Sequence, residues 1–529
     1  MSAGVAARPP AAADVCLILE GTYPYVTGGV SEWLHRLVLA LPEIRFAILH
    51  IAATVGEPPP RRYTMPPNVV ELVDVGIHGG DETPGAGEAI PPAAWDRMRA
   101  FHDELRRDDV SGWAGLLEAT SPAPGRGPSA HELIYGRPAW DVVRQLYEER
   151  APEVSFIDYF WTWRFTHLPI FRLMHARLPQ AAIYHTVSTG WAGLVASLAR
   201  ARTGRPMILT EHGIYARERR MEIDQATWIY VQRQTPMTLQ LGQAFFKELW
   251  TRLFMRLSRL TYAHADLITT IYEGNRQAQL RDGADPAKTL VIPNGIDATR
   301  FAELAPSPPG PGEFRVGFVG RVVPIKDVKT LLRAFKIVIE GCPGASLVLA
   351  GPVDEDVEYA TECRTLAATL GLDGRVQFLG RADVREIYPR IDAMVLTSLS
   401  EGLPLVILEA QAAAIPVVAT DVGACRELLE GRTREDRLLG PSGLVTGIAN
   451  PPATAEALLA LARDVALRQQ MGQAGQQRVR AHYAESDVVL GYRDIYRRFL
   501  AEGSVSEGPR GVGGERGAPG CSGRAPADG

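Results

Sequence analysis

The sequence predicts an α/β protein built from two Rossmann-like domains, and three observations support this fold class. The chain has 529 residues, which is too long for one ordinary hydrophobic core and suits two domains. Short apolar runs alternate with amphipathic stretches in two successive series, a pattern typical of parallel sheets covered by helices. A proline-rich stretch over residues 307–313 separates the two series and indicates an interdomain linker. Two such domains face each other across a cleft, where ligands bind beyond the carboxyl ends of the strands.

Composition places the chain among ordinary globular proteins, with 46% hydrophobic and 22% charged residues. A formal net charge of −5 argues against general nucleic-acid binding. The five cysteines show no metal-ligand spacing, which indicates a reducing compartment without disulfides. We find no signal-peptide pattern and no apolar run of about 18 residues. A cytoplasmic protein is therefore expected, held at the inner membrane only through partners.

The N-terminal domain is expected over residues 14–306. Its first strand, residues 15–19, leads through a glycine-rich loop into an amphipathic helix over residues 31–41, with Ser31 at its N-cap. Further strands are expected at residues 154–159, 182–184, 207–210 and 267–270.

Two insertions are expected in this domain, at about residues 55–137 and 224–259. The first is rich in proline, glycine and charge, with some helix expected at residues 95–105 and a loose loop at 121–129. The second has the pattern of one long helix, and its aromatic side chains either form a partner surface or pack onto the domain. Those aromatic residues are Trp228, Tyr230, Phe245, Phe246, Trp250 and Phe254.

The C-terminal domain is expected over residues 314–485. A helix over residues 486–500 is expected to return to the N-terminal domain, and the composition of residues 503–529 indicates a disordered tail. The strands of the second series are expected at residues 315–319, 346–350, 376–379, 393–396 and 417–419.

A pair of carboxylates gives the strongest functional signal. Glu401 lies in a loop directly after the strand at residues 393–396, and Glu409 lies in the first turns of the next helix. The backbone amides of Gly402 and Leu403 come at the start of that helix, a position suited to phosphate or sugar oxygens. From spacing alone, a solvated loop residue and an ordinary helical acid explain the pair equally well.

Two cations follow the first strand of the second series. Arg321 comes directly after that strand, and Lys326 lies five residues later at the start of a helix. Such a pair is suited to clamping a diphosphate and to stabilising it as a leaving group without a metal. For an isolated pair, two solvated charges in a surface turn are the simpler explanation.

Three motifs together decide between these alternatives. They are the Gly-Arg-x4-Lys loop at Gly320–Lys326, the Glu-Gly-x-Pro-x4-Glu motif at Glu401–Glu409, and Val-Ile-Pro-Asn-Gly-Ile-Asp at Val291–Asp297. Over residues 267–496 the chain resembles the retaining glycosyltransferase family 4, which implies a GT-B fold. The segments 20–30 and 210–218 further resemble the PelF-type branch, the cytoplasmic glycosyltransferases of Pel exopolysaccharide synthesis.

The resemblance implies roles for residues on the donor side. Arg321 and Lys326 would hold the donor pyrophosphate, and Glu409 would accept hydrogen bonds from the ribose. Glu401, with the backbone of Gly402 and Leu403, would contact the transferred sugar. The remaining donor contacts would be backbone contacts: Gly28, Gly29 and Val30 at the phosphate, and Gly380 and Arg381 around the uracil.

The resemblance also implies a catalytic histidine from the N-terminal domain. His185 is the match, at the end of the strand at residues 182–184. A lone histidine is more often a satisfied core residue, but its place at the carboxyl end of a strand before a glycine-rich turn favours a functional role. Further candidates for sugar or acceptor contacts are Glu211, His212, Tyr272 and Asn294.

The expected activity is retaining transfer of a hexose from a UDP-sugar, with UDP-glucose favoured, to a growing polysaccharide or glycan acceptor. No cofactor or metal is expected, because Asp354 and Asp356, which have the spacing of a metal-binding pair, lie in a charged loop typical of a solvated turn. The expected partners are subunits of a membrane-embedded polysaccharide synthase. The alternatives are another glycan or glycolipid acceptor, a GT-B phosphorylase, a sugar-nucleotide epimerase, and a non-catalytic nucleotide-binding scaffold.

Overall fold

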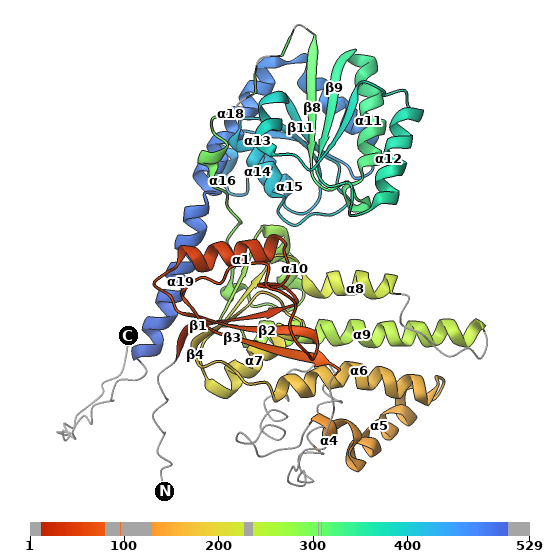
Figure 1. Cartoon of the computed structure of the whole chain (residues 1–529), viewed down its shortest axis with the longest axis vertical. Coiled ribbons are helices and arrows are strands. Elements are labelled where there is room, and N and C mark those ends of the chain that lie inside the picture. The colour runs from red at the N-terminus through yellow and green to blue at the C-terminus, as the bar shows by residue number, and fades with distance from the viewer. Residues whose placement is uncertain are drawn as a thin grey trace, which may run out of the picture.

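Two parallel sheets, each with helices on its faces, form the computed structural model (Figure 1). The structure describes residues 12–79, 96, 130–226, 236–304, 306–307, 309–310 and 312–505. The N-terminal sheet has seven strands in the order β3-β2-β1-β4-β5-β6-β7, and the C-terminal sheet has six in the order β10-β9-β8-β11-β12-β13. All of these strand pairs are parallel, so both domains are Rossmann-like, as the sequence predicts.

Most N-terminal strands are apolar runs, and two of them, β5 and β6, are buried along their whole length. Their bounds are β1 (Ala13–Glu20), β2 (Phe46–Thr54), β3 (Val69–His78), β4 (Ala181–Thr186), β5 (Met207–Glu211), β6 (Leu267–Thr270) and β7 (Thr289–Val291). The helices are α1 (Gly29–Ala40), α4 (Ala130–Tyr135), α5 (Arg137–Arg150), α6 (Phe156–Met174), α7 (Trp191–Thr203), α8 (Tyr215–Gln225), α9 (Pro236–His264) and α10 (Glu273–Arg281).

The C-terminal domain alternates strand and helix more regularly. Its strands are β8 (Glu313–Val319), β9 (Gly344–Ala350), β10 (Val376–Gly380), β11 (Ala393–Leu396), β12 (Val417–Thr420) and β13 (Gly443–Thr446). Its helices are α11 (Val328–Gly341), α12 (Val357–Thr369), α13 (Val384–Ile387), α14 (Leu405–Ala412), α15 (Cys425–Glu430), α16 (Arg434–Arg437), α17 (Pro451–Arg463) and α18 (Val465–His482). The turn η2 (Ala298–Arg300) precedes this domain, and the turn η3 (Pro324–Lys326) precedes α11.

Two expectations for the N-terminal domain are wrong. Residues 154–159, expected as a strand, enter helix α6, because Ser155 is its N-cap and accepts a hydrogen bond from the Asp158 backbone N–H at 3.5 Å. The stretch 55–137, expected as an insertion, contains strand β3 of the main sheet. The helix expected at residues 95–105 and the loop expected at 121–129 lie outside the described residues, apart from Asp96 in a helical conformation.

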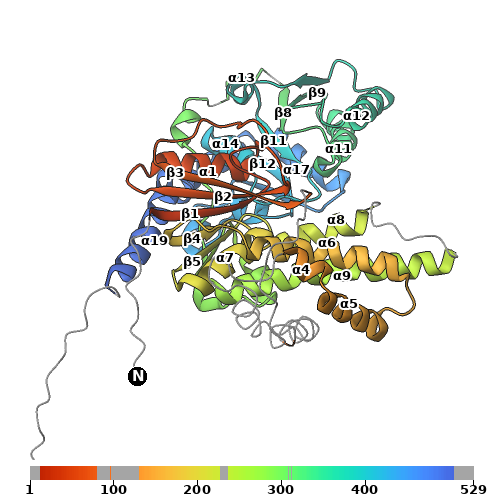
Figure 2. The same cartoon turned by 60° about the horizontal axis from the view of Figure 1, so that its bottom comes forward.

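The aromatic stretch expected at 224–259 forms two helices instead of one, with α8 ending at Gln225 and α9 beginning at Pro236. Phe246, Trp250 and Phe254 are buried in the N-terminal core, so packing explains these three rings. Trp228 and Tyr230 lie outside the described residues. Figure 1 shows α4, α5 and α6 on the side of the N-terminal domain away from the C-terminal domain, with α9 between α6 and α8, and Figure 2 shows α5 on that side as well.

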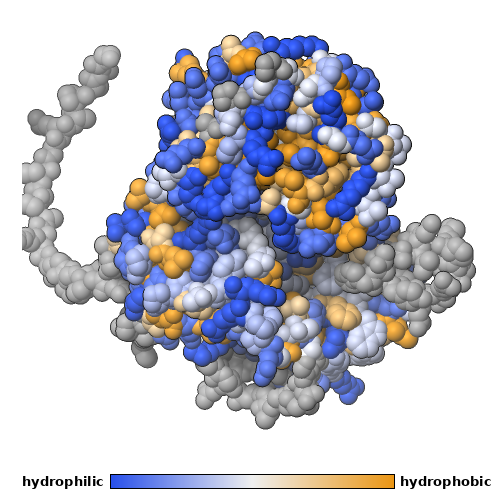
Figure 3. All heavy atoms as spheres, turned by 45° about the horizontal axis from the view of Figure 1, so that its top comes forward, coloured by the Kyte–Doolittle hydropathy of each residue, from blue (hydrophilic) through white to orange (hydrophobic). Residues whose placement is uncertain are grey.

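The last described helix, α19 (Glu485–Val505), crosses back to the N-terminal domain (Figure 1). Its side chains Tyr492 and Tyr496 are buried in the core beneath β1 and β4. A second link is polar, because the Glu427 carboxylate of α15 accepts hydrogen bonds from the backbone N–H groups of Glu273 and Gly274 at 3.0 and 3.1 Å. The surface is hollowed where the two domains meet (Figure 3).

Among the described helices, none combines the length and the apolar composition needed to cross a membrane.

Candidate functional site

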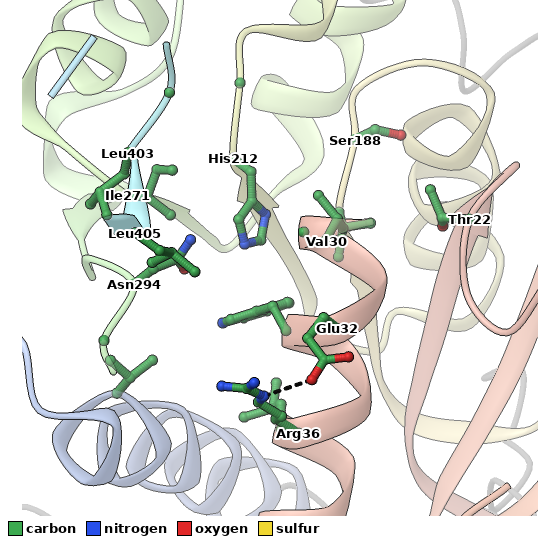
Figure 4. Close-up of a pocket in the computed structure, with 18 of the residues that line it drawn as sticks. Thr22, Val30, Glu32, Arg36, Ser188, His212, Ile271, Asn294, Leu403 and Leu405 are labelled. Atoms are coloured by element: carbon green, nitrogen blue, oxygen red, sulfur yellow. Dashed lines mark hydrogen bonds and ion pairs between the residues drawn. The ribbon is translucent and has the colours of Figure 1, made fainter. Parts of the chain in front are cut away.

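A cavity of about 550 Å³ lies between the two domains and is lined by residues from both (Figure 4). The N-terminal domain contributes the start of α1, with Gly29 and Val30, and the loop after β5, with His212. The C-terminal domain contributes Gly402 and Leu403 at the start of α14. These segments follow the carboxyl ends of strands, which is where ligands bind in open parallel sheets.

Lys326 and Glu401 form an ion pair in the C-terminal domain, beside the cavity-lining Gly402, although neither residue of the pair lines the cavity itself. The Lys326 Nζ donates to Glu401 Oε1 at 2.5 Å, and the Ser398 hydroxyl donates to the same oxygen at 2.5 Å. The two paired side chains are only 15% and 11% exposed. A side chain also fixes the loop, because the Thr397 hydroxyl donates to the Lys326 carbonyl at 3.2 Å. The structure thus joins one cation and one carboxylate that lie 75 residues apart in the sequence.

Arg321 and Arg381 do not join this pair. The Arg321 guanidinium contacts Glu355 at 2.9 Å and is 54% exposed. Arg381 contacts Asp354 at 3.3 Å on the surface. Asp354 and Glu355, the two acids before Asp356, are thus each paired with an arginine. The Asp356 carboxylate accepts a hydrogen bond from the backbone N–H of Tyr359 at the start of α12. Within the described part of the chain, no three potential metal ligands of the His, Cys, Asp or Glu type cluster closely enough to hold a metal ion.

Glu409 lies on α14 and is not part of the Lys326–Glu401 ion pair. Its carboxylate accepts a hydrogen bond from the Tyr388 hydroxyl at 2.8 Å. Burial raises the pKa of Glu409, and the nearby Arg300 and Arg36 oppose that rise. Glu409 does not line the 550 Å³ cavity.

The glycines at the start of α1 face open space. A Cβ added at Gly28 or Gly29 would meet no protein atom within 4 Å, and Gly28 has an extended backbone with φ of 169°. Neither the backbone conformation nor the protein's own packing therefore requires glycine there. The start of α1 keeps room for a ligand beside its backbone amides.

His185 is a core residue in this structure. It is 0% exposed, and both ring nitrogens are partnered, Nδ1 with the Tyr496 hydroxyl at 2.7 Å and Nε2 with Thr210 Oγ1 at 2.8 Å. Burial lowers its pKa to about 3. His185 does not line the cavity, so its position gives no support to the catalytic role that was expected for it. The sequence could not reveal this, because Tyr496 comes from α19.

His212, the weaker candidate from sequence, lines the cavity. Figure 4 shows its ring between Val30 on one side and Asn294 and Leu403 on the other. Both ring nitrogens are shielded from solvent and have no hydrogen-bond partner, while the ring packs edge-on to Trp33 with centroids 4.6 Å apart. Burial lowers its pKa to about 4, so the imidazole is neutral near pH 7 and presents one donor and one acceptor.

The other three candidates lie in different surroundings. Asn294 lines the cavity, whereas Tyr272 does not. Glu211 is 1% exposed and accepts hydrogen bonds from Tyr262 at 2.8 Å and from Gln279 at 2.9 Å. Burial outweighs these bonds and raises its pKa to about 7. Glu211 therefore belongs to the core beneath the site.

The raised pKa of Glu211 predicts a pH-dependent contribution to stability. The unfolded carboxyl titrates near its model value of 4.5 and the folded one near 7, so stability present below pH 4.5 is lost as the pH rises through 7. Relative to Glu211→Gln, which does not titrate, the wild type should lose on the order of 3 kcal/mol between pH 4.5 and 8. Urea unfolding of both proteins across this range measures the difference. A difference that stays constant with pH would contradict the burial of an ionisable Glu211.

The structure adds lining residues that the sequence analysis did not identify. They include Glu20 at the end of β1, Thr22 just after it, Ser188 after β4, and Tyr215 and Arg219 on α8. A sequence signal was present for Thr22 and Ser188, because each of them shortly follows the carboxyl end of a strand, as His212 does.

Two family models match the chain. Residues 13–287, more than half of the chain, match the model described as a domain of unknown function, DUF3492. Residues 313–464 match the model described as glycosyl transferases group 1.

Two curated relatives each match a segment of a little under half of this chain. A D-inositol 3-phosphate glycosyltransferase of Actinosynnema mirum is 32% identical over 251 residues, which cover 44% of this chain and 54% of that protein. The protein of the same name from Rhodococcus erythropolis is 31% identical over 276 residues, covering 48% and 58%. The chain thus spans about half the length of the curated relatives it matches.

Solved structures match over nearly the whole chain. A sucrose-phosphate synthase from Thermosynechococcus elongatus has a TM-score of 0.54 at 17% identity, with 92% of this chain and 100% of that one covered. The Anabaena protein HepE, in complex with UDP and glucose, has a TM-score of 0.52 at 15% identity, with 92% and 99% covered. At identities this low, the structural likeness establishes the fold alone, which is GT-B. The chain therefore belongs to the family defined by the domain of unknown function DUF3492, and in it that domain is joined to a glycosyl transferases group 1 domain.

Proposed function

We propose that this protein is a retaining glycosyltransferase of family 4 that moves a hexose from a UDP-sugar, UDP-glucose first among them, to a glycan acceptor. The observation that carries the proposal is the largely buried Lys326–Glu401 ion pair at 2.5 Å, in which Glu401 directly precedes Gly402 and Leu403 of the interdomain cavity. A nucleotide-sugar transferase needs a cation near the leaving diphosphate and a carboxylate near the sugar. The group 1 match over residues 313–464, and the binding of UDP and glucose by HepE, a protein of the same fold, agree with this assignment.

The proposed reaction takes place on one face of the sugar. Lys326 stabilises the departing diphosphate while the acceptor hydroxyl enters beside it, and a leaving-group oxygen takes the proton. Glu401 orients Lys326 and contacts the transferred hexose, and Glu409 binds the ribose. Gly28, Gly29 and Val30 bring backbone amides to the phosphate, and Gly380 and Arg381 frame the uracil. We assign to His212 the catalytic role that the sequence analysis gave to His185, because His212 lines the cavity and His185 does not.

The proposal includes independence from metal ions. The charge of the leaving diphosphate is then neutralised by Lys326 and by the start of α14. UDP release by protein treated with EDTA should equal UDP release by untreated protein. Loss of activity that only Mn²⁺ or Mg²⁺ restores would contradict this and would point to Asp354 and Asp356 as ligands.

A panel of nucleotide sugars tests the function itself. Thermal shift identifies the donor that stabilises the protein, and UDP release with and without a glycan acceptor measures transfer. We expect UDP-hexoses to stabilise the fold and an acceptor to accelerate UDP release. Stabilisation by UDP with no release under any acceptor would favour the alternative of a nucleotide-binding scaffold.

We further propose that the protein acts in exopolysaccharide synthesis as a member of the PelF-type branch, together with membrane-embedded synthase subunits. The segments that support the proposal are 20–30 and 210–218, which supply Glu20, Thr22, His212 and Tyr215 to the cavity. Co-purification with membranes that carry the synthase subunits, compared with membranes that lack them, tests this assignment.

A further inference from the structure

The N-terminal wall of the cavity carries polar atoms that no protein group satisfies. Thr22 Oγ1, Ser188 Oγ and both ring nitrogens of His212 are shielded from solvent and have no hydrogen-bond partner. All three residues line the same cavity, and Figure 4 shows Thr22 and Ser188 on one side of it, beyond Val30. Buried polar atoms are almost always hydrogen-bonded in native proteins, so such a cluster around a cavity indicates groups that bind a ligand.

A partly buried carboxylate stands beside these atoms. Glu20 lines the cavity and is 15% exposed. Its Oε1 accepts a hydrogen bond from the Tyr215 hydroxyl at 2.6 Å, and its Oε2 accepts one from the Trp191 backbone N–H at 2.9 Å. Each carboxylate oxygen accepts a second hydrogen bond readily, so Glu20 is held in place with capacity left for a donor such as a hydroxyl group.

The charges around the cavity disfavour an anion on this wall. The cavity is lined by four carboxylates but only two guanidinium groups, Arg36 and Arg219. Arg36 is paired with Glu32 at 2.9 Å and with Glu485 at 3.2 Å. Arg219 is paired with Glu222 at 2.6 Å and lies 3.9 Å from Glu20. A phosphate group beside Glu20 would meet only an arginine, Arg219, whose charge is already offset by a carboxylate, and it would face the Glu20 carboxylate.

We propose that this wall, formed by Glu20, Thr22, Ser188 and Tyr215, binds the acceptor and selects an uncharged, polyhydroxylated sugar end over a phosphorylated one. The inference rests on the proposed function, since it assigns the acceptor side of the same site. Sugar hydroxyls satisfy the hydroxyls of Thr22 and Ser188 and donate to Glu20. The proposed acceptor therefore differs from the phosphorylated compound, inositol 3-phosphate, that appears in the name of the curated relatives.

Binding to the UDP-saturated protein separates this inference from the proposed function. The probes are matched pairs that differ by one phosphate: glucose and glucose 6-phosphate, N-acetylglucosamine and its 6-phosphate, and myo-inositol and its 3-phosphate. We expect at least one neutral sugar to bind, and every phosphorylated counterpart to bind at least 10-fold more weakly. If UDP itself fails to bind, the proposed function fails. If UDP binds but no neutral sugar does, or if a phosphorylated sugar binds more tightly, the acceptor inference alone is wrong.

Two variants test the wall without disturbing the fold. Ser188→Ala and Thr22→Val remove hydroxyls that have no protein partner, so neither should lower the melting temperature. Each should weaken binding of the neutral sugar roughly 5-fold, the effect of one hydrogen bond, while the affinity for UDP is retained. Thr361→Val on α12, outside the cavity, is the matched control and should leave both affinities unchanged. Unchanged sugar affinity in both wall variants would overturn the assignment.

Discussion

Replacement of Lys326 by alanine should lower the turnover number by on the order of 100-fold, which is the usual cost of removing one group that stabilises a developing charge. The Lys326 ammonium is only 15% exposed and lies 2.5 Å from Glu401 Oε1. A charge in such an enclosed position acts more strongly than one in water. Steady-state UDP release measures the effect, which we expect mainly in kcat because charge builds up on the diphosphate in the transition state.

Lys329→Ala provides the control for this experiment. Lys329 lies three residues further along, on α11, where it contacts Glu362 at 2.7 Å on the outside of the domain. Its replacement should leave turnover unchanged. Arg321→Ala is a second comparison. The Gly-Arg-x4-Lys motif by itself predicts that this variant also loses on the order of 100-fold in turnover. Near-normal turnover in Lys326→Ala, with an intact circular dichroism spectrum, would refute the role of Lys326 in stabilising the leaving group.

Replacement of His212 by alanine should also reduce kcat by on the order of 100-fold, with little loss of stability. The ring makes no hydrogen bond to the protein, so its removal costs only its packing against Trp33 at the edge of the cavity, whereas a bound sugar would lose a neutral donor and acceptor. The expected result is lower turnover with a nearly unchanged melting temperature. His212→Asn keeps a short donor and acceptor and should recover part of the activity.

His185→Ala should give the opposite result. Its removal leaves the Tyr496 hydroxyl without its 2.7 Å partner and opens a cavity in a fully buried site. We expect a loss of about 3 kcal/mol in the free energy of unfolding, from the lost packing and hydrogen bonds together. Activity per folded molecule should change little. If His185→Ala abolished turnover without destabilising the fold, the assignment of the two histidines would have to be reversed.

Five of the six strands of the C-terminal domain, β8 to β12, and its motif loops follow from the sequence, whereas β13 was not expected. The strand expected at residues 393–396 is β11, with the same bounds, and Glu401 follows it in a loop before α14. Local signals suffice here, because a short apolar run closed by a glycine-rich turn has few other ways to fold. In the N-terminal domain the same rule misassigned residues 154–159, because an apolar aromatic run fits a strand as well as the start of the capped helix α6.

What the sequence determined by itself is therefore the two-domain fold, the positions of strands β8 to β12 and the loops after them that carry the candidate cations and carboxylates. The pairing of Lys326 with Glu401 came from the tertiary structure. Only the tertiary structure decided which histidine meets the cavity. His185 lies near the carboxyl end of β4 and His212 directly follows β5, and nothing near either of them in the sequence distinguishes the two. Helix α19 returns from the far end of the chain and gives His185 its partner Tyr496, while the ring nitrogens of His212 remain unpaired. A contact across 311 residues is set by packing, which no local pattern encodes.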